Sequence, residues 1–298
     1  MSEKIMVVGG SGFIGSHLVD KLLQLGYNVV NVDLKINEKV ETRIVDITDI
    51  NWLNLTFKSI KPEIVFHLAV YGYEESEQNP TKSILINAIG TLNVLKLARK
   101  YNVRKVVHSS SGSIYGEPQI LPLNEGHPTN PTSIYGVTKL CEEHFCHLMM
   151  QRGLTITILR YSNVLGKGRS FGVIYTFKNR IKQDLPLIIF GGKQGNDYVY
   201  VDDVVQANIK CLDHGDNETF NIGSGTNTGI MQLAKQVKNI LNADNQIIIE
   251  KPRPHDPTWQ FYYDITKAKT LLKWKPTINF KQILTKILQD SKEVKYKK

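Results

Sequence analysis

Short apolar runs alternate with longer amphipathic segments through the first half of the chain. The short runs are rich in β-branched residues and the longer segments repeat their apolar positions every three to four residues, which predicts buried strands separated by helices. Because parallel neighbours cannot be joined by hairpins, helical crossovers predict a doubly wound, parallel α/β sheet with helices on both faces. The predicted strands are 4–8, 28–32, 64–69, 105–109 and 155–160, and the predicted helices are 13–25, 83–101 and 135–151.

The alternation of predicted strands and helices ends after about Asn163, where loops and turn signals such as Gly191-Gly192 and Gly195-Asn196 dominate. Residues 231–241 and 280–291 still predict helices. Residues 251–257 contain three prolines and predict a rigid, irregular loop. We therefore expect the second half to contribute a smaller lobe, packed on the carboxyl edge of the sheet.

The composition is that of a soluble globular protein, with 298 residues, 41% of them hydrophobic and 22% charged. No apolar run approaches the roughly 18 residues of a membrane span, and the first residues lead into structure without a signal-peptide profile. The three cysteines are an odd number and cannot form a complete disulfide framework. A cytoplasmic protein is therefore expected, and secreted and membrane classes are disfavoured.

The formal net charge of +9 suits anionic partners, whether nucleic acid, an acidic membrane surface or phosphorylated small molecules. The basic residues are scattered, except for the tail 292–298, which we interpret as a solvated terminus. No Arg-rich low-complexity tract accompanies them. We accordingly expect a small-molecule partner, and neither nucleic acid nor membrane.

A glycine-rich turn separates the first predicted strand from the first predicted helix. It reads Gly9-Gly10-Ser11-Gly12-Phe13-Ile14-Gly15. Glycines in this setting permit a tight turn and close backbone approach to a pyrophosphate, and the following helix offers free amides to it. A turn that binds nothing is the alternative, but strand, turn and helix together favour a Rossmann-type dinucleotide site.

Asp33 closes the second predicted strand, 18 residues beyond Gly15, near the spacing at which a carboxylate accepts hydrogen bonds from an adenosine ribose. This placement favours NAD over NADP. Lys35 leaves the alternative open, because its ammonium could attract a 2′-phosphate.

Tyr135 and Lys139 lie at positions i and i+4 of a predicted helix, so their side chains project from one face. A neighbouring ammonium and an oxidised nicotinamide both favour the phenolate of a tyrosine, which could then remove a hydroxyl proton. Strand 105–109 runs into Ser109-Ser110-Ser111, where a parallel sheet presents side chains at its carboxyl edge. One of these serines could relay a proton; alternatively, they satisfy backbone groups.

A metal site is the competing hypothesis for Cys141, His144, Cys146 and His147. These positions spread around more than half of a helix, so we predict no metal. For the adjacent Asp202 and Asp203, we expect one carboxylate to cap a helix beginning near Val204.

Several motifs occur along the chain in the same order as in the extended short-chain dehydrogenases/reductases, which the chain resembles. More narrowly, it resembles their nucleotide-sugar epimerase and dehydratase group, typified by UDP-glucose 4-epimerase. The similarity runs nearly end to end and is specific for the family, not for a substrate. The motifs are the glycine turn continued by Ser16-His17-Leu18, His67-Leu68-Ala69, Asn87-Ala88-Ile89-Gly90-Thr91, Ser109 to Gly116, Tyr135-x-x-x-Lys139, Leu159 to Val164, Asp197 to Val204, Asn221 to Gly225, and Leu272 to Pro276.

The resemblance implies a role for each matching residue. Ser111 would relay protons, Tyr135 would be the base and Lys139 would bind the cofactor ribose and set the local field. Asn163 would contact the nucleotide diphosphate, with Arg253 as its diphosphate-binding arginine and Ser111 touching the substrate. The expected NAD contacts are Gly9, Gly12, Phe13, Ile14, Gly15, Asp33, Asp46, Ile47, Leu68, Ala69, Val70, Asn87, Ser109, Tyr135, Lys139 and Ser162, of which Asp46 and Ile47 would meet the adenine and Asn87 the nicotinamide half.

Departures from the family pattern narrow the range of reactions that we expect. Dehydratases of this group carry an Asp-Glu pair where this chain has Gly112 and Ser113, so a 4,6-dehydratase is disfavoured. Asn196 stands where many members place a second diphosphate-binding arginine, which implies either a lower diphosphate affinity or substitution by another cation such as Lys193. Ser162 replaces a frequently aromatic residue.

The resulting expectation is an NAD-dependent nucleotide-sugar 4-epimerase, most simply for a UDP-sugar, that inverts C4 through a transient 4-keto sugar. Residues 1–165, with a returning segment at about 197–225, would form the NAD-binding Rossmann domain, and 166–196 with 226–298 the nucleotide-sugar lobe. A homodimer through helices 83–101 and 135–151 is implied by the resemblance. The alternatives are an NAD(P)H-dependent reductase of a nucleotide-linked 4-keto sugar, and a non-catalytic relative that binds RNA or a protein.

Overall fold

Seven parallel strands form one central sheet, and the computed structural model describes residues 3–169, 172–253 and 258–289 of the chain. The spatial order is β11-β6-β5-β4-β1-β2-β3, which changes direction at β1 as in other doubly wound sheets. The sheet is made of β1 (Lys4–Val8), β2 (Asn28–Asp33), β3 (Glu41–Ile44), β4 (Ile64–His67), β5 (Lys105–Ser111), β6 (Ile156–Tyr161) and β11 (Thr219–Ile222).

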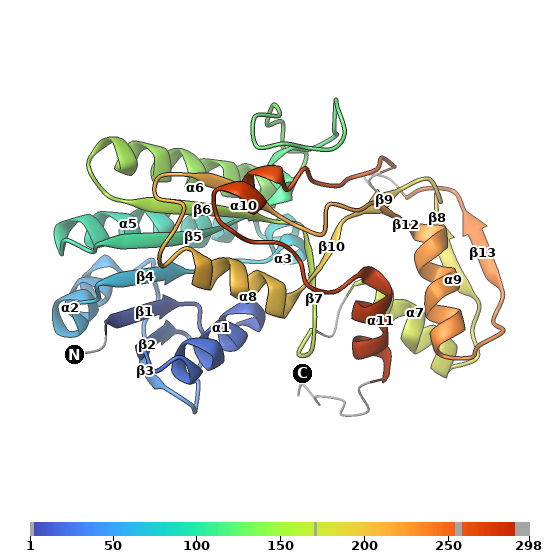
Figure 1. The fold of residues 1–298 in the computed structure, drawn as a ribbon, viewed down its shortest axis with the longest axis horizontal. Helices are drawn as coiled ribbons and strands as arrows, with labels where there is room; N and C mark the ends of the chain where they lie inside the picture. The colour runs from blue at the N-terminus through green and yellow to red at the C-terminus, as the bar shows by residue number, and fades with distance from the viewer. Residues whose placement is uncertain (1–2, 170–171, 254–257, 290–298) are drawn as a thin grey trace.

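Helices cover both faces of this sheet (Figure 1). One apolar core lies between the sheet and α1 (Phe13–Gln24) with α8 (Val201–Lys210), and a second lies under α2 (Ile50–Ile60), α5 (Thr91–Lys100) and α6 (Ile134–Gln151). Ile5 to Val8 are all solvent-inaccessible, because β1 is buried on both faces of the sheet. Strands in this position have continuous apolar sequences. The predicted doubly wound α/β fold is confirmed.

The five predicted strands are present, with ends that move by one or two residues. The two edge strands, β3 and β11, were not predicted, because β3 is mostly exposed and polar and β11 is only four residues long. The predicted helix 83–101 is also more complex than expected. It comprises the end of α4 (Pro80–Ser83), a π-helical segment, η1 (Ile84–Gly90), and α5.

The prediction that Asp202 or Asp203 caps a helix near Val204 is wrong. Helix α8 begins at Val201 and Tyr200 occupies its N-cap position, so both aspartates lie within the first helical turn. Their charges face the positive end of the helix dipole there. The Asp203 carboxylate accepts hydrogen bonds from the backbone N–H (3.0 Å) and hydroxyl (2.6 Å) of Thr277.

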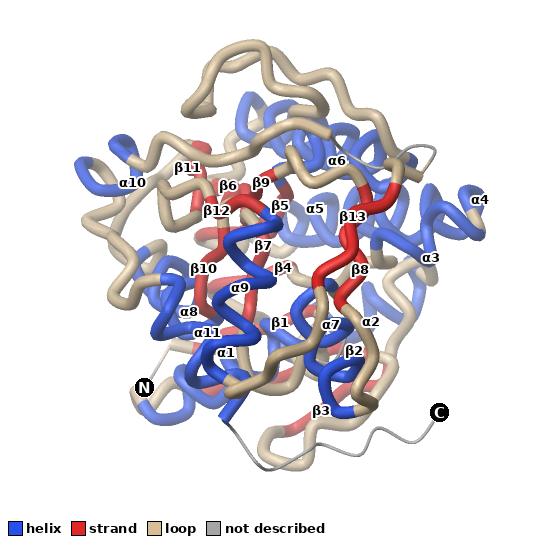
Figure 2. The backbone as a smooth tube through the Cα atoms, turned by 90° about the vertical axis from the view of Figure 1, so that its right-hand side faces the viewer, coloured by secondary structure: helices blue, strands red, loops and turns tan. Residues whose placement is uncertain are grey.

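A smaller group of elements lies beyond one end of the sheet (Figures 1 and 2). Its apolar core lies largely among α7 (Val173–Lys182), β8 (Leu187–Phe190), α9 (Ile230–Ile240) and α11 (Phe280–Gln289), and β13 (Ile247–Glu250) pairs with β8. Shorter pairs are β7 (Asn163–Leu165) with β10 (Tyr198–Tyr200), and β9 (Gly195–Asn196) with β12 (Thr228–Gly229). Helix α10 (Thr266–Thr270) and Trp274, which the sequence division assigns to the smaller lobe, instead pack on the α1–α8 face.

A buried carboxylate joins loops that surround the boundary of the two cores. Asp197 is inaccessible to solvent and accepts hydrogen bonds from the N–H (2.6 Å) and hydroxyl (2.7 Å) of Ser224 and from the N–H groups of Gly225 (3.0 Å) and Tyr263 (3.2 Å). Burial raises the pKa of Asp197, and these hydrogen bonds oppose that rise. One side chain thereby fixes two loops from distant parts of the sequence.

A buried ion pair ties α6 to β6. The Arg160 guanidinium donates to both carboxylate oxygens of Glu143, with the shortest contact 2.7 Å, and to the Tyr115 hydroxyl at 2.7 Å. Ser110 donates to the same carboxylate at 2.5 Å. Removing one member of such a pair leaves the other charge buried without its counter-ion.

We therefore expect Arg160→Ala to lower the free energy of unfolding by about 3–5 kcal/mol in urea titrations followed by circular dichroism. Arg104→Ala is the matched control, because Arg104 pairs with Glu3 where both side chains are largely exposed. That change should cost at most about 1 kcal/mol. Equal effects of the two substitutions would contradict the structural importance of the buried pair.

Candidate active site

Backbone contacts leave no room for a Cβ atom at two glycines of the turn after β1, Gly9 and Gly15. A Cβ added at Gly15 would lie 2.1 Å from the Gly9 carbonyl oxygen, and one at Gly9 would lie 2.5 Å from the Ala69 nitrogen. Gly9 also has a positive φ of 90°. The N-cap of α1 is Gly12, whose lack of a side chain leaves the first-turn amides uncapped. This geometry fits a pyrophosphate at the N-terminus of α1.

Asp33 lies beside the same turn. Its carboxylate accepts hydrogen bonds from the backbone N–H of Ser11 at 2.9 Å and from that of Lys35 at 3.0 Å. The acid at the end of β2 is thus held next to the phosphate-binding turn, where a dinucleotide ribose would lie. Phe13 and Ile14, at the start of α1, pack against the core below the turn.

The residues expected at the adenine end lie between β3 and α2. Ile47 is buried, and its carbonyl accepts a hydrogen bond from Asn93 at 3.0 Å. Asp46 is exposed and accepts from the N–H and hydroxyl of Thr48, each at 2.8 Å. A Cβ on Gly90 would lie 2.5 Å from the Ile47 side chain, so the start of α5 packs directly on this residue.

The segment after β4 passes along the glycine turn. The Leu68 N–H donates to the Val8 carbonyl at 2.7 Å, Ala69 packs against Gly9, and Val70 is exposed. Asn87 is fully buried, accepts from the Tyr71 N–H at 2.7 Å and donates to the Thr138 hydroxyl at 3.0 Å. Asn87 therefore holds this segment against α6, and its amide is engaged by protein groups.

Helix α6 begins where β5 ends. The Ser133 hydroxyl caps it by accepting the Gly136 N–H at 3.0 Å, and a Cβ on Gly136 would lie 2.5 Å from the Ser113 carbonyl oxygen. The absence of that Cβ lets α6 approach η2 (Gly112–Ile114), which follows Ser111 directly. The structure thus brings Tyr135 to Ser111, whose hydroxyl also contacts that of Ser113 at 3.2 Å.

Lys139 is buried one turn beyond Tyr135. Its ammonium donates to the Ser109 carbonyl and to the Glu142 carboxylate, each at 2.6 Å. Burial is the largest single influence and lowers the Lys139 pKa, but the charge and hydrogen bond of Glu142, together with Tyr135, outweigh it, so the pKa is raised. Lys139 is therefore a permanent cation beneath Tyr135 at physiological pH.

The pKa of Tyr135 is raised, whereas the sequence predicts that Lys139 and an oxidised nicotinamide together bring it toward working pH. Burial is the main cause, because it disfavours the phenolate; Lys139 opposes burial, and Glu142 adds to the rise. The Ser111 hydrogen bond and the charge of Arg169 favour the phenolate. The predicted direction of the Lys139 contribution is correct, but it is smaller than the desolvation it opposes.

Three of the remaining predicted residues lie along β5, β6 and β7, and Arg253 lies beyond β13. The Ser109 hydroxyl lies 3.1 Å from that of Tyr161, and the backbone N–H of Ser162 donates to Ile222 at 3.0 Å. Asn163 donates to the Asn196 side chain at 3.2 Å. Arg253 is exposed, with its guanidinium 4.6 Å from the centre of the Phe190 ring. The prolines at 254 and 257 lie outside the described residues.

Three residues near Tyr135 were missed by the sequence reasoning. The Tyr73 ring, at the start of α3 (Tyr73–Gln78), lies 5.9 Å from the Tyr135 ring in an edge-to-face contact. Arg169 follows β7 and bonds to the Val164 carbonyl. Glu142 carried a signal, since i and i+3 positions on a helix face each other. Tyr73 begins a six-residue helix and Arg169 lies on a loop, and neither segment is long enough to show a periodic pattern.

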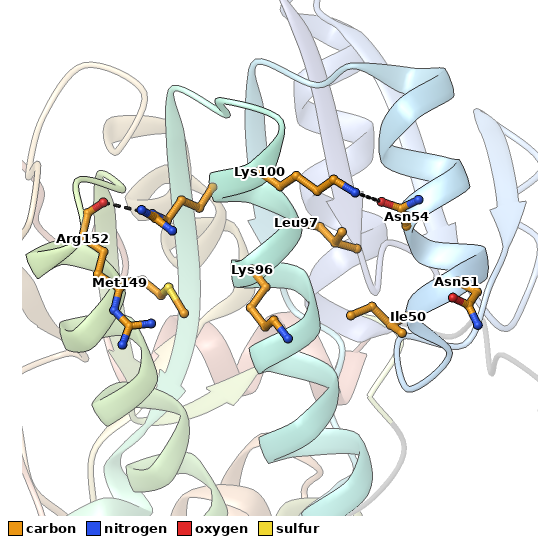
Figure 3. Close-up of a pocket in the computed structure, with 9 residues that line it drawn as sticks. Ile50, Asn51, Asn54, Lys96, Leu97, Lys100, Met149 and Arg152 are labelled. Carbon is orange, nitrogen blue, oxygen red and sulfur yellow. Dashed lines mark hydrogen bonds between the residues drawn. The ribbon is translucent and has the colours of Figure 1, made fainter.

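A surface cleft of about 500 Å³ lies elsewhere, between α2, α5 and the end of α6 (Figure 3). Lys96, Arg99, Lys100 and Arg152 line it, and Lys100 donates to Asn54 at 2.8 Å. None of the predicted site residues lines this cleft. It is therefore separate from the site around Tyr135.

Neither a metal cluster nor a membrane-spanning helix is present in the described part of the chain. Within the described ranges, no cluster of three or more His, Cys, Asp or Glu side chains has the geometry to hold a metal ion. Among the same residues, no helix combines the length and the apolar character that a bilayer crossing requires.

The sequence profile of the NAD dependent epimerase/dehydratase family matches residues 5–223. The chain belongs to this family. Its cofactor is NAD, which fits the glycine turn and the placement of Asp33. It is an enzyme of the epimerase type, so the interpretation as a non-catalytic relative is not supported.

Relatives in the family have different reactions. A putative UDP-glucose 4-epimerase of Methanocaldococcus jannaschii is 39% identical over 95% of this chain and 97% of its own. The UDP-glucose 4-epimerase of Thermotoga maritima, solved with UDP-glucose, superimposes with a TM-score of 0.90 at 37% identity, over 96% of this chain and 97% of that one. A UDP-N-acetyl-alpha-D-glucosaminuronate decarboxylase of Bacillus cytotoxicus is 30% identical over 99% of both chains.

Substituting Gly15 by alanine tests the family's phosphate-binding turn. The added methyl group collides with backbone rather than with a movable side chain, so the turn must open and its amides must leave the pyrophosphate. We expect NAD to bind at least about tenfold more weakly in calorimetric titrations of protein stripped of bound dinucleotide. In the control, Gly229→Ala, the methyl group enters open space. Unchanged NAD affinity in Gly15→Ala would refute this assignment.

Proposed function

We propose that this protein is an NAD-dependent 4-epimerase of a UDP-sugar. The observation that carries the proposal is the meeting of Tyr135, Lys139 and Ser111 at the carboxyl edge of the sheet, beside a glycine turn that fits NAD. The similarity to two UDP-glucose 4-epimerases over almost the whole chain supports the same activity.

In the proposed mechanism, Tyr135 accepts the proton of the sugar C4 hydroxyl and later returns it. Ser111 hydrogen-bonds the same hydroxyl and relays the proton, since its side chain already contacts Tyr135. NAD, when bound, supplies the hydride acceptor at C4 and the positive charge that further favours the phenolate. Lys139 has used two of its three N–H groups on Ser109 and Glu142, and its third would hold the ribose.

Between the two hydride transfers, the 4-keto sugar ring must rotate so that it presents its opposite face to the cofactor. The protein therefore has to hold the substrate by its diphosphate and leave the ring free to rotate. We assign diphosphate contacts to Asn163 and Arg253, and place the nucleotide-sugar lobe at 166–196 and 226–298, except for α10 and Trp274, which pack on the α1–α8 face. An arginine suits this role, because its planar fork donates to two phosphate oxygens at once. Asp33, Asp46, Ile47, Leu68, Ala69 and Val70 would surround the cofactor, with Ser109 and Ser162 nearby.

The competing reactions are less well supported by the residues. A 4-keto-sugar reductase commonly uses NADPH, whereas the Asp33 carboxylate lies beside the glycine turn and would repel a 2′-phosphate. Gly112 and Ser113 carry no acid for a dehydratase.

We also propose a cytoplasmic homodimer. The three cysteines are free thiols, which agrees with a reducing compartment. Large apolar side chains are exposed on η1 and α6, which belong to the segments 83–101 and 135–151 that the family resemblance implies at a dimer interface. They are Ile84, Leu85 and Ile89 on η1, and Val137 and Leu148 on α6.

Tyr135→Phe removes the proposed base and keeps the ring. We expect kcat for conversion of UDP-galactose to UDP-glucose to fall at least about 100-fold, with bound NAD retained. Tyr101→Phe is the matched control, because its hydroxyl bonds to Asn54 at the remote cleft; its kcat should stay within about twofold. Undiminished turnover by Tyr135→Phe would refute the assignment of the base.

The reaction itself is tested with UDP-glucose, UDP-galactose and UDP-glucuronic acid, each incubated without added cofactor. We expect redox-neutral inversion at C4, detected by proton NMR. Release of carbon dioxide from the uronic acid would instead indicate a decarboxylase, and NADPH consumption on a 4-keto sugar would indicate a reductase.

A further inference from the structure

A line of buried titratable side chains runs beneath the Tyr135–Lys139 pair. It begins at Lys139 and continues through Glu142, one turn further along α6, to His108 on β5 and His67 on β4. All four side chains are within a few per cent of complete burial. The proton transfers proposed above use Lys139 but none of the other three.

Glu142 is the only acid among these four side chains, and its contacts are short. Burial raises the pKa of Glu142, and Lys139 opposes that rise through its charge and its hydrogen bond. The ammonium of Lys139 lies 2.6 Å from its Oε2 atom, and the His108 Nε2 atom lies 3.1 Å from the same oxygen. The other oxygen, Oε1, is buried and makes no geometrically good hydrogen bond within the described part of the chain. A carboxylate is buried at such a place only if a counter-charge compensates it.

The two histidines do not supply that counter-charge. Burial lowers the pKa of His67 to about 3, with the neighbouring His108 adding to the effect, and it lowers the pKa of His108 as well, together with Lys139. Both imidazoles are therefore neutral at physiological pH. His67 instead pairs with the Thr91 hydroxyl of α5 at 2.8 Å.

Lys139 and Glu142 thus form a buried ion pair directly below Tyr135. Glu142 raises the Tyr135 pKa while Lys139 lowers it, and Arg169 from the β7–α7 loop also lowers it. From α6 itself, Cys146 also faces the pair, and burial raises its thiol pKa well above the usual range, so that it is uncharged. The local charge at Tyr135 therefore depends on Glu142 as well as on Lys139.

We propose that Glu142 is a positioning residue of this site, which fixes the Lys139 ammonium against the Ser109 carbonyl and offsets part of the positive charge that Lys139 presents to Tyr135. The proposal deepens the proposed function, since it concerns the proton acceptor of that same reaction. Glu142 itself touches neither substrate nor cofactor. It acts through the place and the charge of Lys139.

Two substitutions separate charge from position. Glu142→Gln keeps the size and an acceptor oxygen for Lys139 but removes the negative charge. Glu142→Asp keeps the negative charge but moves it away from Lys139 by the length of one methylene group. Both variants keep the Ser109 carbonyl as a hydrogen-bond acceptor for Lys139. Glu142→Gln removes the charge that raises the Lys139 pKa, whereas Glu142→Asp keeps a counter-charge beside it. Asp213→Asn, on the exposed turn after α8, controls for loss of one acidic charge elsewhere.

The direct readout is ionisation of Tyr135, followed by tyrosinate ultraviolet absorbance in the full-length protein. Each variant is compared with the same variant carrying Tyr135→Phe, at equal dinucleotide content. We expect Tyr135 to ionise about one pH unit lower in Glu142→Gln than in the parent protein, and within a few tenths of a unit in Glu142→Asp and Asp213→Asn. An unchanged or higher titration in Glu142→Gln overturns the proposal.

Steady-state kinetics supply a second readout. In Glu142→Gln, the acid limb of the pH profile of kcat should shift to lower pH together with the Tyr135 titration. In Glu142→Asp, the acid limb should stay at the parental pH, but kcat should fall about three- to tenfold with KM unchanged, because Lys139 is displaced. If Glu142→Gln fails to fold, Glu142→Asp decides alone, and parental kcat in that variant overturns the proposal. The absorbance titration needs no sugar, so it stands even if the proposed epimerase reaction is not observed.

Discussion

The hydrogen bond from the Lys139 ammonium to the Ser109 carbonyl joins the end of β5 to the first turns of α6, and the geometry of the site depends on it. A buried ammonium is destabilising unless its charge is compensated, and here a backbone oxygen and a carboxylate both do so at 2.6 Å. With Lys139 fixed, Tyr135 one turn earlier and Ser111 at the strand end have little freedom to separate. The close approach of Gly136 to η2 adds a second restraint of the same kind.

Other buried charged groups lie near this bond, and each is bonded to groups from another element or loop. Arg160 and Glu143 join β6 to α6, and Asp197 joins the loops at 224–225 and 263. Such pairs contribute modestly to net stability, but the loss of one partner is strongly destabilising. They fix the positions of the sheet edge, the helix that carries Tyr135 and the loops of the smaller lobe relative to one another. A nucleotide-sugar would have to lie between these parts.

The sequence predicted the parts of the site that are local. The glycine turn, Asp33 and the Tyr135–Lys139 spacing each lie within one strand–turn–helix unit, where periodicity and motif spacing determine geometry. It did not predict the raised Tyr135 pKa, because burial is a property of the packed molecule. His67, His108 and Glu142 were also beyond reach as a group, since they come from β4, β5 and α6 and meet only through strand register. Helices 231–241 and 280–291 of the smaller lobe were predicted from their periodicity. The short strands there and at the sheet edges were not, because two to four residues are too few to show a period.

The central claim is that hydride leaves C4 of the sugar and returns to the opposite face of the same carbon within one protein molecule. It is tested by incubating the purified protein with UDP-glucose carrying deuterium at C4, in ordinary water and without added cofactor, and examining the product by NMR. We predict a C4-inverted sugar that retains its deuterium. Loss of the label to solvent, or an unchanged configuration at C4, would contradict it.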